Sequence, residues 1–148
     1  MHSAPPSATP PLWALRLGYA GLVPFVFGAL LVHLVEPSLM AFAMLALSGY
    51  AATIASFLGG IHWGLAMRDT RGTHLFPYVW GAVPSLLASI AVIMPPWAGL
   101  VVLGVLLAAC YLVDRRLYRA YQMDGWLPLR LRLTVVASLS CMVGAYGL

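Results

Sequence analysis

This sequence contains very little charge and no lysine. Only 8% of its 148 residues are charged, and all eight basic residues are arginines, against four acidic residues. Soluble domains carry about 25% charged residues, so a hydrophobic fraction of 62% and a mean hydropathy of +0.92 exclude an ordinary soluble protein. A nucleic-acid-binding surface needs a soluble basic face, so we expect no nucleic-acid partner despite the positive net charge.

Recognisable catalytic and metal-binding motifs are also missing. The sequence contains no HExxH, no CxxC, no glycine-rich phosphate loop and no evident Ser/His/Asp set. We therefore expect no enzyme, no cofactor and no metal site. His33 and His62 differ in predicted depth by about 20 Å, whereas zinc ligands all lie ~2 Å from the ion. Cys110 and Cys141 differ in depth by roughly 13 Å, so they cannot form a disulfide and should be free thiols.

The sequence does contain five long apolar stretches. Each has ~18–29 residues, and ~20 residues are enough to cross the hydrocarbon layer as a helix. They cover residues 12–35, 38–66, 75–94, 96–113 and 129–147. The pattern predicts an all-α protein with one five-helix transmembrane domain over residues 12–148. A disordered, proline-rich tail over residues 1–11 should precede it.

The arginines predict how the helices are oriented. Arg16 lies at the start of the first span, and every other arginine follows the second or the fourth span, so all eight fall on one side. Arginines in short loops stay on the cytoplasmic side, which predicts an N-in/C-out protein of the bacterial inner membrane. There the arginines would contact anionic lipid headgroups. The expected interface residues are Arg68, Arg71, Arg115, Arg116, Arg119, Arg130, Arg132 and Trp126.

Proline and glycine indicate irregular points in three spans. Pro24 should kink the first helix, because its ring removes one backbone hydrogen bond. The second stretch would be ~43 Å long as one helix and must tilt, protrude or break, and Gly59-Gly60 is the predicted break. Gly21 and Pro24 in the first span match Gly81 and Pro84 in the third, which raises the hypothesis of a two-helix repeat. Residues 114–128 should form a short helix lying in the headgroup layer between the fourth and fifth spans.

Within the predicted spans, His62 is the strongest candidate for a functional residue, and Trp63 and Ser56 are candidates beside it. It should point into the bundle. One interpretation makes it a marker of a proton, ion or ligand path, since ionisable residues are costly inside a membrane. The other makes it a structural imidazole, bonded to a carbonyl freed at Gly59-Gly60 or to a neighbouring hydroxyl. His33 and Glu36 more simply end a span at the interface.

Small residues on several helices indicate close helix–helix contacts, because they let two backbones approach. On the second helix Ser56 and Gly59 belong to such a face. The residues expected to pack helices together are Gly59, Gly60, Gly64, Gly81, Ser85, Thr134 and Ser138.

Several segments of this sequence resemble one family of small membrane proteins. They are SFLGGIHWG, WGAVPSLLA, DRRLYR before a final LRLRLT, and LGYAGLVPF near the start. The family is known as domain of unknown function 3429 and is related to eukaryotic transmembrane protein 69. The resemblance implies a five-helix membrane protein and implies that His62 and Trp63 belong to the family pattern. It implies no activity.

Three functions remain as expectations. The first is a non-enzymatic accessory or assembly subunit that packs against other membrane-protein subunits, because small-residue faces are plentiful and polar groups scarce. The second is a small homo-oligomeric transporter or proton-coupled carrier that uses His62, suggested by the broken helix and the repeat. The third is a lipid- or quinone-binding membrane protein that uses the arginines and Trp63.

Overall fold

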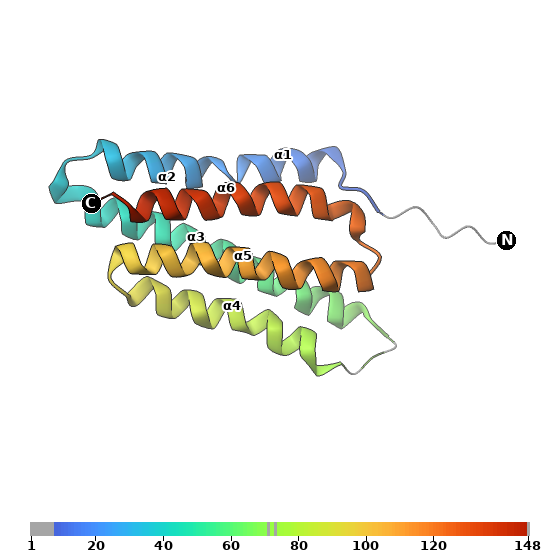
Figure 1. Ribbon diagram of the computed structural model, residues 1–148. Coiled ribbons are helices and arrows are strands. Elements are labelled where there is room, and N and C mark those ends of the chain that lie inside the picture. The colour runs from blue at the N-terminus through green and yellow to red at the C-terminus, as the bar shows by residue number, and fades with distance from the viewer. Residues whose placement is uncertain (1–7, 71, 73, 148) are drawn as a thin grey trace.

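The computed structural model describes residues 8–70, 72 and 74–147, and these form helices joined by short turns (Figure 1). The helices are α1 (Leu12–Ala20), α2 (Val23–Leu34), α3 (Pro37–Arg68), α4 (Leu75–Ile93), α5 (Pro96–Ala120), the 3₁₀ turn η1 (Asp124–Trp126) and α6 (Leu127–Ala145). Proline occupies the first or second position of α2, α3, α5 and α6, where its missing N–H costs no helical hydrogen bond.

Five helical segments are long and apolar enough to cross a membrane, which confirms the predicted number of spans. They are Leu12–Leu34, Pro37–Arg68, Leu75–Ile93, Pro96–Ala120 and Asp124–Ala145. The first span consists of α1 and α2 together. The chain is therefore a polytopic membrane protein in which nearly every described residue belongs to the spans or to the tight turns between them.

The first span is interrupted just before Pro24, as its sequence predicts. Pro24 has no N–H to donate to the preceding turn, and α1 ends at Ala20 while α2 begins at Val23. The hydroxyl of Tyr50 on α3 donates a hydrogen bond of 2.7 Å to the carbonyl oxygen of Gly21. A neighbouring helix thus satisfies a backbone group at the break, as a membrane interior requires.

The predicted break at Gly59-Gly60 is wrong. α3 runs through both glycines as one helix of 32 residues, which corresponds to ~48 Å of length against ~30 Å of hydrocarbon. The excess length is accommodated by an oblique path, since α3 passes behind α6 and α5 in Figure 1. It packs against α2, α4, α5 and α6 in turn.

The proposed repeat also relates unlike segments, because α4 continues through Pro84 without the interruption found at Pro24.

The predicted headgroup helix over residues 114–128 is also wrong. α5 continues to Ala120, so Asp114 and the following arginines are part of a transmembrane helix. Gln122 then adopts a left-handed backbone conformation with φ 57°, and the N–H of Met123 donates to the carbonyl oxygen of Tyr118. This is a common way to end a helix, and it leaves only η1 as the short connection to α6.

The described arginines lie at one end of the bundle, which we call the arginine end. It comprises the beginnings of α1, α4 and α6 and the ends of α3 and α5, within about two turns, at the right of Figure 1. Arg71 and tail residues 1–7 lie outside the described residues. Residues 8 and 9 lie close to Gly125 of η1, where an added Cβ would meet their backbone.

Candidate functional site

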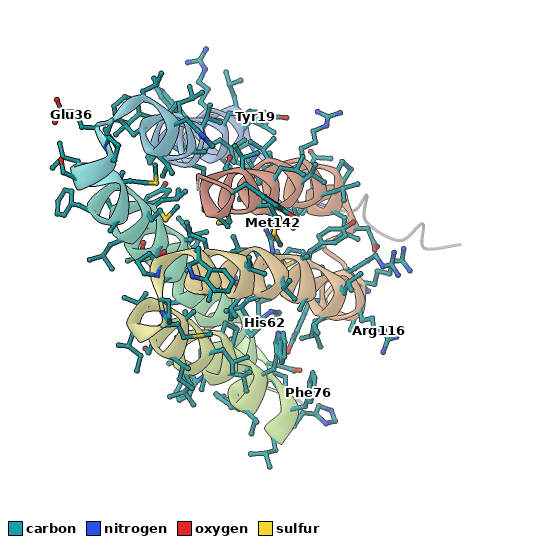
Figure 2. All side chains as sticks on the ribbon, turned by 60° about the vertical axis from the view of Figure 1, so that its left-hand side comes forward. Tyr19, Glu36, His62, Phe76, Arg116 and Met142 are labelled. Atoms are coloured by element: carbon teal, nitrogen blue, oxygen red, sulfur yellow. The ribbon has the colours of Figure 1, made fainter. Side chains whose placement is uncertain are left out.

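His62 lies inside the bundle and contacts a carboxylate. Its side chain is 1% exposed, and Figure 2 shows it among the helices while the labelled Arg116 and Glu36 project outward. His62 Nε2 lies 2.5 Å from Oδ1 of Asp114 on α5. An ionised carboxylate only accepts hydrogen bonds, so in this contact the N–H of His62 Nε2 is the donor and Asp114 the acceptor. Neither a freed glycine carbonyl nor a hydroxyl is the partner that His62 uses.

Asp114 connects His62 to an arginine of α6. Its second oxygen, Oδ2, accepts a hydrogen bond of 2.5 Å from a terminal nitrogen of Arg130, and the other terminal nitrogen of Arg130 donates to Oγ1 of Thr134 at 3.3 Å. Asp114 is 1% exposed and Arg130 is 7% exposed. We call His62, Asp114 and Arg130 the buried ionic cluster. It joins α3, α5 and α6 at one level of the bundle.

The cluster is electrically balanced when His62 is neutral. The single negative charge of Asp114 offsets the single positive charge of Arg130, which is the condition under which charges are tolerated away from water. Two polar atoms nevertheless have no hydrogen-bond partner among the described residues, namely Nδ1 of His62 and Nε of Arg130. The ring of Tyr118, which is 2% exposed, lies 6.3 Å from the imidazole of His62 between ring centroids and closes the cluster toward the arginine end.

The cluster lies a short distance inside the arginine end. His62 is six residues before the end of α3, Asp114 is six before the end of α5, and Arg130 is three after the start of α6. At ~1.5 Å per residue these positions lie roughly 5–9 Å below the helix ends. The cluster can therefore fix three helix ends to one another, and it holds a proton donor and a carboxylate in contact within the membrane span.

Two members of the cluster fell outside the residues that the sequence singled out for chemistry. The sequence placed Asp114 just beyond the fourth span and Arg130 at the interface. A periodic signal could have placed both, because buried positions of α5 continue from Leu107 and Cys110 to Asp114 and Tyr118 at helical spacing. On α6 the same spacing connects Arg130, Thr134, Ala137 and Cys141, all of which are buried. The fourth span was predicted to end at residue 113, so Asp114 was placed outside it and was not recognised as the partner of His62.

The remaining predicted chemical residues take other positions. Trp63 of α3 is 45% exposed and packs against α4, where its Nε1 donates to the carbonyl oxygen of Tyr78 at 2.9 Å. The hydroxyl of Ser56 donates to Ala52 within its own helix. His33 contacts the Val143 carbonyl of α6 through Nε2 at 3.0 Å. Cys110 and Cys141 are buried free thiols.

The residues that were predicted to pack helices together have different surroundings in the structure. Gly59 faces Gly81 of α4 so closely that a Cβ on either glycine would collide with the other's backbone. Gly60 and Gly64 have open space where a Cβ would be. Ser85 of α4 is half-buried, and its carbonyl accepts a bond from Ser89. The Oγ of Ser138 is buried without a partner among the described residues.

The described arginines at the arginine end are exposed, apart from Arg130. Arg119 lies 3.9 Å from Asp124, with both side chains more than half exposed. Arg132 donates to the hydroxyl of Tyr19 at 3.1 Å, and Trp126 is half-buried at the start of α6. The exposed members are Arg16, Arg68, Arg115, Arg116, Arg119 and Arg132.

Comparison with known proteins agrees with the membrane fold. The chain is 38% identical over 142 residues to transmembrane protein 69 of Xenopus tropicalis, with 89% of this chain and 53% of that protein covered. It thus spans about half the length of this relative. No solved structure matches the chain. The family described as protein of unknown function (DUF3429) matches residues 10–146. The chain therefore belongs to the DUF3429 family of membrane proteins.

Proposed function

We propose that this protein is a non-enzymatic accessory or assembly subunit that binds a transmembrane helix of a larger complex. It would lie N-in/C-out in a bacterial inner membrane, with the arginine end cytoplasmic, because arginines are retained on that side. The observation that carries the proposal is the outward face of α3. We call Gly49, Thr53, Ser56, Gly60 and Gly64 the outer stripe, and these five residues fall within about 80° on a helical wheel of 100° per residue.

The outer stripe is unoccupied within this chain. A Cβ added at Gly49, Gly60 or Gly64 would meet nothing within 4 Å. Thr53, Gly60 and Gly64 are exposed. An open hollow of about 470 Å³ continues the stripe between α3 and α4, lined on the α4 side by Ala88, Ser89 and Val92. In a membrane, small residues on a helix surface allow a second helix to approach closely, and nothing in the bilayer itself requires them.

Hydroxyl groups in the same hollow fit a partner helix. Thr53 donates to the carbonyl of Tyr50 at 2.7 Å, Ser56 to Ala52 and Ser89 to Ser85, each at 2.9 Å. Their protons are therefore used within their own helices, while each oxygen still has a lone pair to accept a bond. Hydrogen bonds between membrane helices contribute about 0.6 kcal/mol each. The face thus offers close approach and weak polar contacts, as expected for a subunit interface.

Native mass spectrometry of the gently isolated, N-terminally tagged protein tests this proposal. We expect a stoichiometric foreign membrane subunit, and we expect the double substitution Gly60→Leu/Gly64→Leu to abolish its co-isolation. Ala108→Leu is the matched control, since Ala108 is an exposed small residue of α5 away from the outer stripe. A bare homo-oligomer in the wild type, or full co-isolation by the double variant, would contradict the proposal.

A proton-coupled carrier is the second candidate, and the contact between His62 and Asp114 favours it. This pair is buried within the span and could pass a proton between imidazole and carboxylate. The discontinuous helix that suggested transport is absent, because α3 is continuous. His62→Asn keeps a donor opposite Asp114 but cannot titrate. Proton flux in proteoliposomes that His62→Asn abolishes would support the carrier, and unchanged flux would remove it.

A further inference from the structure

A cavity of about 380 Å³ lies between α1, α2, α3, α5 and α6, and no residue of α4 lines it. Its wall is apolar except for Tyr118, Trp126, Arg130 and Thr134. This volume is at the lower end of the range for small-molecule sites, which is ≈ 300–1,000 Å³. The cavity can hold one ring and the beginning of one hydrocarbon tail.

The cavity opens sideways into the hydrocarbon layer. Leu17 of α1 and Phe57 of α3 both line it, yet they are 69% and 66% exposed, so they form its mouth. α1 packs against α6 and has almost no contact with α3. A molecule dissolved in the membrane could therefore enter between α1 and α3 without crossing the aqueous phase.

Arg130 gives the cavity a polar end, and its Nε lacks a hydrogen-bond partner among the described residues. Two nitrogens of its guanidinium already donate to Asp114 and Thr134. The side chain lines the cavity and is more than nine-tenths buried. A buried N–H without an acceptor is destabilising, so an oxygen of a bound molecule would supply the acceptor that Nε of Arg130 lacks.

Charge and depth define what that molecule should be. Asp114 already offsets the charge of Arg130, so the site favours a neutral acceptor such as a carbonyl oxygen over a charged phosphate. Arg130 lies about 5 Å below the start of α6, and Ala137 lies a further ~10 Å toward the middle of the membrane. Both residues line the cavity. A ligand would thus lie along the helices with its oxygen toward the arginine end and its tail toward the bilayer centre.

We propose that this cavity binds a membrane quinone, with one carbonyl oxygen of the ring on Nε of Arg130 and the isoprenoid tail leaving through the mouth between α1 and α3. A phospholipid fits less well, because it brings a charged phosphate and two chains to a small site with a balanced charge. This binding site is separate from the outer stripe, so it goes beyond the proposed subunit role and stands or falls independently.

The test measures binding of decylubiquinone to the purified full-length protein in detergent, by native mass spectrometry at increasing quinone concentration. Ala14→Phe fills the cavity from α1 without altering the buried ionic cluster. Ala20→Phe is the matched control, because Ala20 is exposed on the same helix and does not line the cavity. Arg130→Lys keeps the charge opposite Asp114 but removes the Nε donor.

We expect saturable binding of one quinone by the wild type and by Ala20→Phe, and loss of binding in Ala14→Phe. Arg130→Lys should weaken binding about tenfold, as loss of one charge-assisted hydrogen bond would. Absence of saturable binding, or equal binding by Ala14→Phe and Ala20→Phe, would overturn the proposal. A co-purified phospholipid that Ala14→Phe displaces, without quinone binding to the wild type, would also overturn it and identify a lipid site.

Discussion

The inward and outward faces of α3 carry neighbouring glycines with opposite surroundings. Gly59 is in backbone contact with α4, whereas Gly60, one residue later, has no atom within 4 Å of the position that a Cβ would take. The inward face also carries His62 and the buried ionic cluster. Glycine therefore has two roles on α3. Gly59 allows close packing within the protein, whereas Gly60 leaves the outer surface free of side chains. The sequence pattern alone treats both as packing positions.

Removing the acid of the buried ionic cluster should have the largest effect on stability. Asp114→Ala leaves the charge of Arg130 and the donor of His62 without an acceptor inside the span. Loss of one partner of a buried ion pair costs about 3–5 kcal/mol. We expect a decrease of this size in the free energy of unfolding, measured by steric trapping in bicelles. Asp124→Ala, which affects only the exposed pair with Arg119, should cost at most about 1 kcal/mol.

A double-mutant cycle would show whether Asp114 and Arg130 stabilise each other within the buried ionic cluster. Replacing Asp114 by Asn and Arg130 by Gln together should destabilise less than the sum of the two single replacements, because no uncompensated charge is left. Additive losses would mean that Asp114 and Arg130 do not support each other. The inward face of α3 would then be held mainly by apolar packing.

Gly59→Ala should have an intermediate effect. Its Cβ would collide with the carbonyl of Gly81, so α3 and α4 must separate. Overpacking of this kind typically costs about 1–3 kcal/mol. The same unfolding measurement should show this loss, while folding and membrane insertion remain possible. A stability equal to that of the wild type would show that the approach of α3 to α4 is looser than the structure indicates.

Gly60→Ala should change the free energy of unfolding least, and it should raise this energy where the other substitutions lower it. The methyl group enters open space, and alanine is favoured over glycine in a helix by up to about 1 kcal/mol. We expect the isolated protein to be unchanged or slightly stabilised. A large destabilisation would contradict the assignment of Gly60 to the outer stripe. Gly60→Leu should likewise leave the isolated protein folded, so that any lost partner binding reflects the surface and not unfolding.

The fold was largely predictable from the sequence because span number depends on apolar length alone. Five stretches and the kink near Pro24 were correct, and so was the inward position of His62. The ends of spans were less predictable, since Asp114 and Arg130 look like interface residues until their positions on the helical stripes are considered. The continuity of α3 through Gly59-Gly60 was missed, because a glycine pair in a helix can mark either a break or a close contact, and here Gly59 contacts Gly81 of α4. The partner of His62 depends on how three helices come together.

Site-directed photo-crosslinking in native membranes would test the central claim, the division of α3 into an inward and an outward face, most directly. A photoreactive residue at Gly64 should form one discrete adduct with the same foreign subunit that native mass spectrometry identifies. The same residue at Ala108 should react only with lipid. Lipid adducts alone at Gly64, or adducts between two copies of this chain, would contradict the assignment of the outer stripe to a partner subunit.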